Sequence, residues 1–242
     1  MDLGLDGRVA IVAASSKGLG RASALALAAE GARVVITGRS PESLAATEAE
    51  IAATGAEALA LRLDVTDPEV PERLVTAAID RFGRLDIVVP NAGGPPHGRA
   101  LDVDDAALTQ ALEANLLASV RLVRAAVPVF TAAGWGRVCC ISSYTITQAA
   151  PLLALSNTAR SALWAWVKTA ANDLAGSGVT VNVVCPGLHA TDRMIELGAT
   201  GGTRPVGDPE DFGRVVAFLC SGPARFVNGA ALVVDGGETL AL

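Results

Sequence analysis

The stretch Val9-Ala10-Ile11-Val12-Ala13-Ala14-Ser15-Ser16-Lys17-Gly18-Leu19-Gly20-Arg21 is the part of the sequence that decides the expected fold. It joins an apolar run typical of a buried strand to a glycine-containing loop and then to a segment with helical spacing. A loop between a first strand and a helix presents backbone N–H groups and the positive end of the helix dipole to a pyrophosphate. The stretch therefore predicts a dinucleotide-binding βα unit; the alternative is a turn that serves only packing.

The remainder of the chain repeats this alternation of strand and helix. Short β-branched runs predict strands at Val9–Val12, Val34–Thr37, Ile87–Val89, Val138–Ile141, Val179–Val184 and Leu232–Val234. Helical spacing predicts helices at Arg21–Glu30, Glu42–Thr54, Glu69–Phe82 and Ala106–Ala132, with start signals at Ser40-Pro41 and Asp67-Pro68. Apolar strands that alternate with helices are typical of a parallel sheet covered on both faces. We predict a single α/β domain over residues 1–242, a Rossmann-type doubly wound parallel sheet of about seven strands with helices on both faces.

Composition excludes several classes of protein. A content of 51% hydrophobic and 18% charged residues is too apolar for a disordered chain. The formal net charge of −6 argues against nucleic acid as the main partner. The acidic N-terminus is unlike a signal peptide, and polar residues interrupt the longest uncharged run, between Arg137 and Arg160, so no membrane span is expected. A small-molecule substrate, with neither nucleic acid nor membrane as partner, is the remaining expectation.

The cysteine and histidine contents point to a reducing compartment and to a site without metal. None of the four cysteines, Cys139, Cys140, Cys185 and Cys220, forms a C-x-x-C pair. We therefore predict buried, free thiols, as is typical of a cytoplasmic protein. Because the chain has two histidines, His97 and His189, a zinc site is not expected and we predict no metal.

Several short motifs mark the chain beyond the first loop. They are Asp64-Val65, Asn91-Ala92-Gly93, Asn115, Pro186-Gly187 with Thr191, Asn228-Gly229 and Asp235-Gly236-Gly237. Through them the sequence resembles the short-chain dehydrogenase/reductase family over nearly its whole length, in particular its 3-oxoacyl-ACP reductase-like members. The family's loop T-G-x-x-x-G-x-G is matched at Gly18 and Gly20, whereas Ala13 and Ala14 replace the Thr and the first Gly. An alanine Cβ restricts φ and can hold a phosphate further away.

The resemblance implies a bound nicotinamide dinucleotide. NAD-binding members place an acid at the end of the second strand, but Thr37-Gly38-Arg39-Ser40 has none. Lys17 and Arg39 can pair with a 2′-phosphate, so we expect NADP(H), with NAD(H) or no cofactor as alternatives. The expected cofactor-binding residues are Ser15, Ser16, Lys17, Gly18, Leu19, Gly20, Arg39, Asp64, Val65, Asn91, Ala92, Gly93, Pro186, Gly187 and Thr191.

The resemblance also implies a Ser-Tyr-Lys catalytic centre, with Tyr and Lys spaced Y-x-x-x-K on one face of a helix. Alignment places Ser143 on the family's Ser, but Ser156 and Arg160 on its Tyr and Lys. An alkyl hydroxyl is a far weaker acid than a phenol, and an arginine keeps its proton at ordinary pH. The usual proton donor is therefore absent, whereas Arg160 can still bind a ribose hydroxyl or a carboxylate.

Two side chains are candidates for a substitute acid. Tyr144, the single tyrosine, follows Ser143, and His189 lies in the Pro186–Thr191 segment that flanks the nicotinamide in the family. For each of them the alternative is a loop side chain held by one hydrogen bond. The expected catalytic set is Ser143, Ser156, Arg160, Asn115, Tyr144 and His189.

Two further segments carry expectations about access and assembly. The glycine-rich segment 192–208 predicts a mobile substrate lid, on which Arg193 and Arg204 can meet an anionic substrate. The nearly uncharged helix Leu152–Ala175 corresponds to a helix that packs between subunits in the family. A homodimer or homotetramer is therefore implied, with burial against its own sheet as the alternative.

Two functions remain open from the sequence. The first is an NADP(H)-dependent oxidoreductase that reduces a carbonyl or oxidises an alcohol with atypical acid catalysis. The second is a non-redox lyase or isomerase, or a catalytically inactive cofactor-binding protein, on the same scaffold. Chemistry that proceeds after the cofactor has been stripped would exclude hydride transfer.

Overall fold

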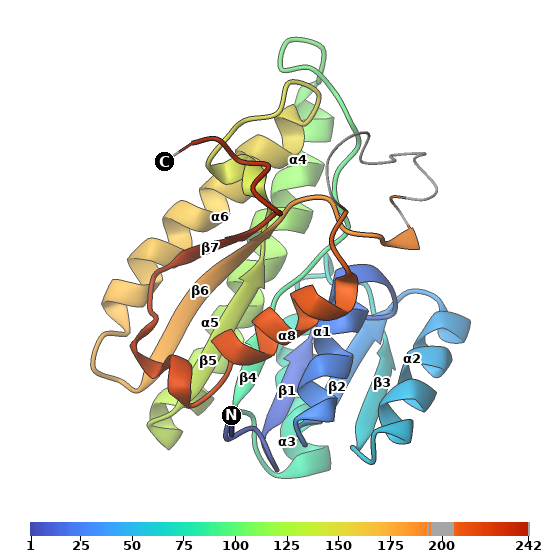
Figure 1. Ribbon diagram of the computed structural model, residues 1–242, viewed down its shortest axis with the longest axis vertical. Coiled ribbons are helices and arrows are strands. Elements are labelled where there is room, and N and C mark those ends of the chain that lie inside the picture. Colours follow the sequence, from blue (N-terminus) through green and yellow to red (C-terminus); the bar gives the residue numbers. More distant parts are fainter. Residues whose placement is uncertain (193, 195–205, 242) are drawn as a thin grey trace.

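A parallel sheet forms the middle layer of the computed structural model, which describes residues 1–192, 194 and 206–241 (Figure 1). Its seven strands follow the order β3-β2-β1-β4-β5-β6-β7. The chain moves outward from β1 to β3, returns to place β4 on the other side of β1, and then continues outward to β7. This reversal between β1 and β4 is the topological switch point, where doubly wound sheets bind their ligands.

The strands are β1 (Val9–Val12), β2 (Arg33–Gly38), β3 (Ala58–Arg62), β4 (Ile87–Val89), β5 (Gly136–Ile141), β6 (Val179–Pro186) and β7 (Ala231–Val234). The helices are α1 (Gly18–Ala29), α2 (Pro41–Ala53), α3 (Val70–Phe82), α4 (Asp105–Leu112), α5 (Ala118–Ala133), α6 (Ala154–Asp173) and α8 (Pro209–Leu219). Three short helical turns join them: η1 (Glu113–Leu117), η2 (Tyr144–Ile146) and η3 (Pro223–Phe226).

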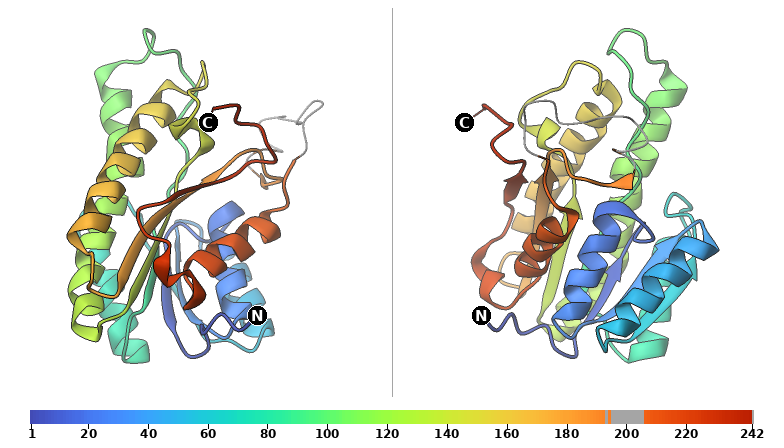
Figure 2. Two further views of the ribbon diagram at one scale, coloured as in Figure 1. Left: turned by 60° about the vertical axis from the view of Figure 1, so that its left-hand side comes forward. Right: turned by 45° about the vertical axis from the view of Figure 1, so that its right-hand side comes forward.

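Helices cover both faces of the sheet (Figures 1 and 2). On one face α3, α5 and α6 pack around Leu74, Val123 and Leu163, which are buried. On the other face α1, α2 and α8 pack around Leu27 and Phe212, which are also buried. Because both faces are covered, every residue of β1, β4 and β5 is buried, as the apolar runs Val9–Val12, Ile87–Val89 and Val138–Ile141 predict; β5 also buries Arg137 near its start.

The predicted α/β fold is confirmed, with small shifts at the ends of elements. The Ser40 hydroxyl caps α2 by accepting the Ser43 N–H, as its position before proline predicts. The start signal at Asp67-Pro68 is displaced: the Asp67 carboxylate accepts the Glu69 N–H and its carbonyl accepts the Val70 N–H. These residues therefore form a turn, and α3 begins only at Val70. The elements β3 and α8 are not among those predicted above from the sequence.

The helix α6 buries its apolar stripe within its own subunit. Leu155 and Ala159 pack against α4, and Leu163 and Val167 pack into the core beneath the helix. The alternative that this helix covers its own sheet therefore accounts for the stripe. The predicted homo-oligomer stays a prediction.

The helical stretch Asp105–Ala133, which comprises α4, η1 and α5, is long and apolar enough to cross a membrane by length and composition alone. In the structure its α5 part lies on the sheet and buries Val123, Ala126 and Phe130 in the core. The core helix of a sheet protein passes the same test of length and composition. The absence of a membrane partner stays a prediction.

This helical stretch widens into a π-turn at η1, between α4 and α5. A π-turn accommodates one residue more than an α-helical turn and is frequently found at functional sites. Asn115 lies at its centre and is 3% exposed. The turn therefore places a buried polar side chain on the segment that packs beside α6.

Asp86, directly before β4, is a buried charge at the opposite, amino end of the sheet. Its carboxylate accepts hydrogen bonds from Arg8 Nη1 (2.8 Å), from Arg84 Nε and Nη2 (2.8 and 2.7 Å) and from the Val9 N–H (2.9 Å). Burial raises the pKa of this carboxyl, but the hydrogen bonds from Arg84, Val9 and Arg8 together outweigh burial and hold its pKa below the ordinary value. The ionised Asp86 carboxylate, directly before β4, thus links the start of β4 to that of β1 through its hydrogen bonds with Arg8 and Val9.

All four cysteines are buried and unpaired, as predicted. Burial raises the pKa of Cys185 to about 12, so its thiol stays protonated and inert at ordinary pH. Over the residues that the structure describes, no group of three His, Cys, Asp or Glu side chains is placed to hold a metal ion.

Candidate active site

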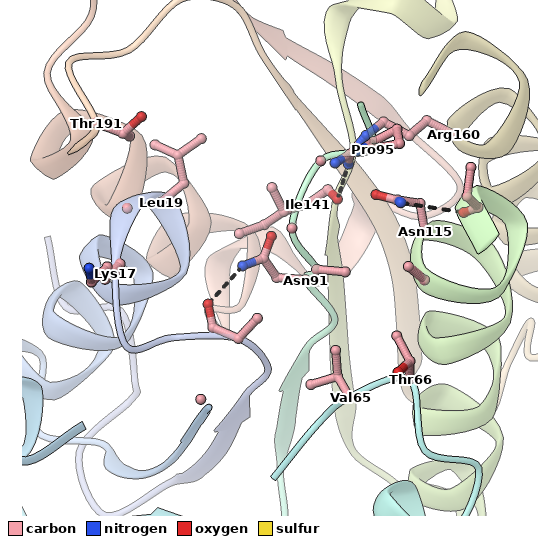
Figure 3. Close-up of a pocket in the computed structure, with 18 of the residues that line it drawn as sticks. Lys17, Leu19, Val65, Thr66, Asn91, Pro95, Asn115, Ile141, Arg160 and Thr191 are labelled. Atoms are coloured by element: carbon pink, nitrogen blue, oxygen red, sulfur yellow. Dashed lines mark hydrogen bonds between the residues drawn. The ribbon is translucent and has the colours of Figure 1, made fainter. Parts of the chain in front are cut away.

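A cavity of about 1030 Å³ opens along the carboxyl ends of the strands, at the switch point of the sheet (Figure 3). Figure 3 shows Lys17 and Leu19 on one side of it and Asn115 and Arg160 on the other. A cavity at this place and of this size is typical of a cofactor and substrate site. The predicted residues that line it are Ser16, Lys17, Gly18, Leu19, Arg39, Asp64, Val65, Asn91, Ala92, Gly93, Asn115, Arg160, Pro186, Gly187, His189 and Thr191.

The first loop carries a strained backbone at Ala14. Its φ of 45° lies in the left-handed region that favours glycine, and among the described residues it is the one non-glycine residue with a positive φ. Two contacts hold this conformation: the Ala14 N–H donates to Thr37 Oγ1 (2.9 Å), and Asn91 Nδ2 donates to the Ala14 carbonyl (3.1 Å). Ala14 also lines the cavity. The alanine that replaces glycine at this point therefore strains the backbone of the loop.

Replacing Ala14 by glycine is expected to raise the free energy of unfolding by about 1 kcal/mol, because the left-handed conformation no longer clashes with a Cβ. Urea unfolding measures this change. Ala13→Gly is the matched control: Ala13 is buried at the end of β1 and does not have a positive φ, so glycine should destabilise the protein there. Equal effects of the two substitutions would contradict the interpretation.

Two predicted cofactor-binding residues of this loop, Ser15 and Gly20, do not line the cavity. The Ser15 side chain is fully buried, donates to the Val12 carbonyl (2.7 Å) and accepts the Thr37 N–H (3.0 Å). The Ser15 side chain therefore stabilises the loop and does not face the cavity, whereas the sequence predicts that it binds the cofactor. Gly20 is a point of close approach, since a Cβ there would lie 2.5 Å from the Ala14 carbonyl oxygen. The loop has room for no larger residue at that position.

The side of the cavity near β2 is electropositive. Lys17 and Arg39 are exposed and line it, and β2 ends at Gly38 without an acidic residue. The Asp64 carboxylate is turned onto its own loop, where it accepts the Thr66 N–H (3.0 Å) and hydroxyl (2.8 Å). The Thr66 N–H lowers the pKa of Asp64, burial opposes this effect, and the Thr66 hydroxyl and the charge of Arg39 add to it. This side of the cavity suits a phosphate group.

His189 holds a fixed position in the wall formed by the segment after β6. It is 5% exposed, its Nδ1 lies 3.2 Å from the Gly187 carbonyl oxygen, and its ring meets Phe212 edge-on at 5.2 Å. Gly187 is itself confined, since a Cβ there would lie 2.6 Å from the Asp235 Cβ. The segment therefore presents a histidine of defined orientation to the cavity.

Asn115 and Arg160 form the wall on the side of α4 and α6. Asn115 Nδ2 donates to the Ala111 carbonyl (3.3 Å), while its buried Oδ1 has no hydrogen-bond partner. Arg160, which is 8% exposed, donates from Nη1 to the carbonyls of Ile141 (3.0 Å) and Ser142 (2.8 Å). A buried carbonyl oxygen without a partner is costly, so Oδ1 marks a place where a ligand or water can supply a donor.

Comparison with known proteins finds relatives over almost the whole chain. The family model described as enoyl-(acyl carrier protein) reductase matches residues 13–239. Dehydrogenase/reductase SDR family member 4 of Bos taurus is 33% identical over 245 residues, covering 97% of this chain and 88% of that protein. The 3-oxoacyl-[acyl-carrier-protein] reductase of Synechocystis sp. is 32% identical over 243 residues, covering 98% of each.

This chain belongs to the short-chain dehydrogenase/reductase family. The likeness extends to solved structures. L-sorbose reductase from Gluconobacter frateurii, in complex with NADPH and L-sorbose, has a TM-score of 0.94 to this structure at 30% identity, and the match covers 100% of both chains. The protein thus belongs to a family of oxidoreductases. This membership also accounts for the order of the sequence motifs.

In this family member the expected catalytic residues are not all brought to the cavity. Arg160, Asn115 and His189 line it, whereas Ser143, Tyr144 and Ser156 do not. Of the expected cluster of Ser143, Ser156 and Arg160, the structure thus places Arg160 in the cavity wall and the two serines outside its lining. The catalytic roles themselves stay predictions.

The loop after β4 is attached to the start of α6. The Gly98 N–H donates to the Leu152 carbonyl (2.9 Å) and the Ala154 N–H donates to the Gly98 carbonyl (3.2 Å), so the loop is tied to the start of α6. The same loop supplies Gly94, Pro95 and Pro96 to the cavity wall. Ser143 is engaged elsewhere, because its Oγ accepts the Thr145 N–H (3.2 Å) at the start of η2.

Sequence reasoning missed Ser142 as a site residue. Ser142 lines the cavity, is 2% exposed, and its buried Oγ has no hydrogen-bond partner. The alternation of side chains along a strand could have identified it, because this alternation places residue 142 on the same face of β5 as Cys140, toward α5 and α6. The predicted lid at 192–208 falls largely on residues 193 and 195–205, which lie outside the described residues, as do Arg193 and Arg204.

Proposed function

We propose that this protein is an NADP(H)-dependent oxidoreductase that interconverts a carbonyl and an alcohol on a small molecule. The observation that carries the proposal is the pair of cations, Lys17 and Arg39, on the cavity wall where β2 ends without an acid. L-sorbose reductase, the similar protein named above, is complexed with NADPH, which supports the same cofactor here.

The described residues fit a dinucleotide. The N-terminus of α1 begins at Gly18 and presents backbone N–H groups and the positive end of its dipole to the cavity, as pyrophosphate binding requires. Val65 and Asn91 line the wall between this loop and α4, and Pro186, Gly187 and Thr191 line the wall after β6. When bound, the nicotinamide supplies or accepts the hydride, and the protein supplies orientation and a proton.

The proton in this proposal comes from His189. Among the described residues that line the cavity, it is the one of the type that most often serves as a general acid in enzymes. Its Nδ1 contact with the Gly187 carbonyl fixes the ring beside the segment that flanks the expected nicotinamide. Asn115 Oδ1 adds an unpartnered acceptor on the cavity wall near α4 and α6. An atypical acid of this kind replaces the missing Tyr of the family.

Titration of the purified protein with NADPH and NADH tests the cofactor. We expect NADPH to bind at least 10-fold more tightly, and Arg39→Ala to weaken NADPH by about 10-fold or more with little effect on NADH, because a charge-assisted contact to the 2′-phosphate is lost. Arg225→Ala, an exposed arginine on η3 that does not line the cavity, is the matched control. Tighter binding of NADH, or equal losses for both nucleotides, would overturn the assignment to NADP(H).

We further propose that the protein is a cytoplasmic homodimer or homotetramer. Buried, unpaired cysteines support a reducing compartment. The edge strand β7 exposes Leu232, and η3 next to it exposes Phe226 almost completely, which supports a contact with a second copy. Analytical ultracentrifugation tests the assembly, and a monomer at micromolar concentration would contradict it.

A further inference from the structure

The end of β5 lacks a hydrogen-bond donor that a parallel sheet normally supplies. Ile141 of β5 lies opposite Val184 of β6, and the Ser142 N–H donates to the Val184 carbonyl (2.8 Å). In a parallel ladder the next donor on β6, two residues after Val184, points back at the Ser142 carbonyl. That residue is Pro186, which has no N–H. The ladder therefore ends one hydrogen bond short, at the Ser142 carbonyl.

Arg160 supplies the missing donor from α6. Its Nη1 lies 2.8 Å from the Ser142 carbonyl oxygen and 3.0 Å from that of Ile141, and both hydrogen bonds are buried. Hydrogen bonds from a charged donor are roughly twice as strong as those between neutral groups. One guanidinium nitrogen thus donates to two successive backbone carbonyls at the end of β5.

The backbone held in this way is part of the cavity wall. Ile141 and Ser142 both line the cavity, and the Ser142 Oγ, which has no partner of its own, takes its position from this backbone. Ser143 follows at once and caps η2. Movement of the Ser142 carbonyl would therefore displace this part of the cavity wall together with the start of η2.

We propose that Arg160 is a positioning residue, which fixes the Ile141–Ser142 backbone through the hydrogen bond that Pro186 cannot make. This assignment differs from the expectation that Arg160 acts as a cation on cofactor or substrate. It rests on the geometry of β5, β6 and α6, and so it stands apart from the choice of cofactor.

A backbone N–H introduced at residue 186 provides a specific test. Wild type, Arg160→Met, Pro186→Ala and the double variant are compared by amide hydrogen exchange at Ile141 and Ser142, without cofactor. Arg160→Met should accelerate exchange at these amides about 10-fold or more, since a charge-assisted hydrogen bond is lost. The double variant should regain most of this protection, because the alanine N–H at residue 186 can reach the Ser142 carbonyl.

Affinity for NADPH, followed by fluorescence, is the second measurement. Arg160→Met should weaken NADPH, and Pro186→Ala added to it should restore the affinity to within about 3-fold of the Pro186→Ala protein, since restoring the positioning contact does not require a charge. Unchanged exchange in Arg160→Met, lost affinity that Pro186→Ala does not recover, or a double variant that fails to fold would each overturn the proposal. If wild type binds no NADPH, the proposed function fails and the exchange measurement alone decides the role of Arg160.

Discussion

Replacing Asp86 by alanine is expected to lower the free energy of unfolding by about 2 kcal/mol or more, because the change removes a buried carboxylate that accepts charge-assisted hydrogen bonds and the N–H of a buried strand residue. The Asp86 carboxylate is 4% exposed and carries four hydrogen bonds, from Arg8, Arg84 and the Val9 N–H. Its loss leaves the buried Val9 N–H without a partner and removes the counter-charge of two partly exposed guanidinium groups. Urea unfolding at neutral pH measures the effect.

The exposed pair Arg81–Glu57 serves as the control for Asp86. Its side chains are 52% and 54% exposed, so Glu57→Ala should cost less than about 1 kcal/mol. A loss at Asp86 as small as that at Glu57 would contradict the structural assignment.

The same carboxylate predicts a dependence of stability on pH. Because the folded-state pKa of Asp86 lies below the ordinary value, its stabilisation is complete above the unfolded-state pKa, near 4, and is lost as the pH falls through the folded-state pKa. Wild type should therefore lose stability in acid more steeply than Asp86→Asn, which has no proton to take up. Parallel slopes for the two proteins down to about pH 3 would count against this origin of acid sensitivity.

Replacing His189 by glutamine is expected to lower NADPH-dependent turnover by about 10²-fold or more, the usual scale for loss of a general acid. Glutamine keeps a polar side chain of similar reach but cannot release a proton. Because His189 lines the cavity without lying in the first loop, the affinity for NADPH should change little. Oxidation of NADPH in the presence of a panel of small ketones and aldehydes measures turnover, and fluorescence titration measures affinity.

Tyr144→Phe is the matched comparison for His189→Gln. Tyr144 was the second candidate acid in the sequence, but it does not line the cavity, so removal of its hydroxyl should change turnover by less than about 3-fold. The reverse pattern, with Tyr144→Phe inactive and His189→Gln unaffected, would transfer the acid role to the tyrosine and require the loop after β5 to rearrange.

Much of the fold could be predicted because its local signals and its tertiary environment agree. Val9–Val12 and Ile87–Val89 are apolar, β-branched and buried on both faces, and both strands lie where the pattern places them. The strand β3 gives no such signal, since Ala58-Leu59-Ala60-Leu61 has no β-branched residue and lies half-buried at the edge of the sheet. Its strand conformation comes from pairing with β2, which is a tertiary contact.

The candidate site was predictable where it depends on backbone position and less so where it depends on side-chain direction. Gly18, Asn91 and Pro186 line the cavity because the ends of parallel strands meet at one edge. Alignment also placed Ser143 and Ser156 near that edge, but neither lines the cavity, and the Ser143 hydroxyl instead accepts the Thr145 N–H. The α8 start was readable, since Asp208-Pro209 repeats the cap-and-proline signal of Ser40-Pro41.

The π-turn at Glu113–Leu117 has a consequence for the rotational phase of the helix. One extra residue in a turn rotates everything after it by about 100° relative to an uninterrupted α-helix. Before the turn, Ala111 faces α6 in a small cluster with Leu155; after it, Val123 and Phe130 face the sheet. A single continuous helix can thus serve two different partners, and Asn115 lies at the point where its apolar face changes direction.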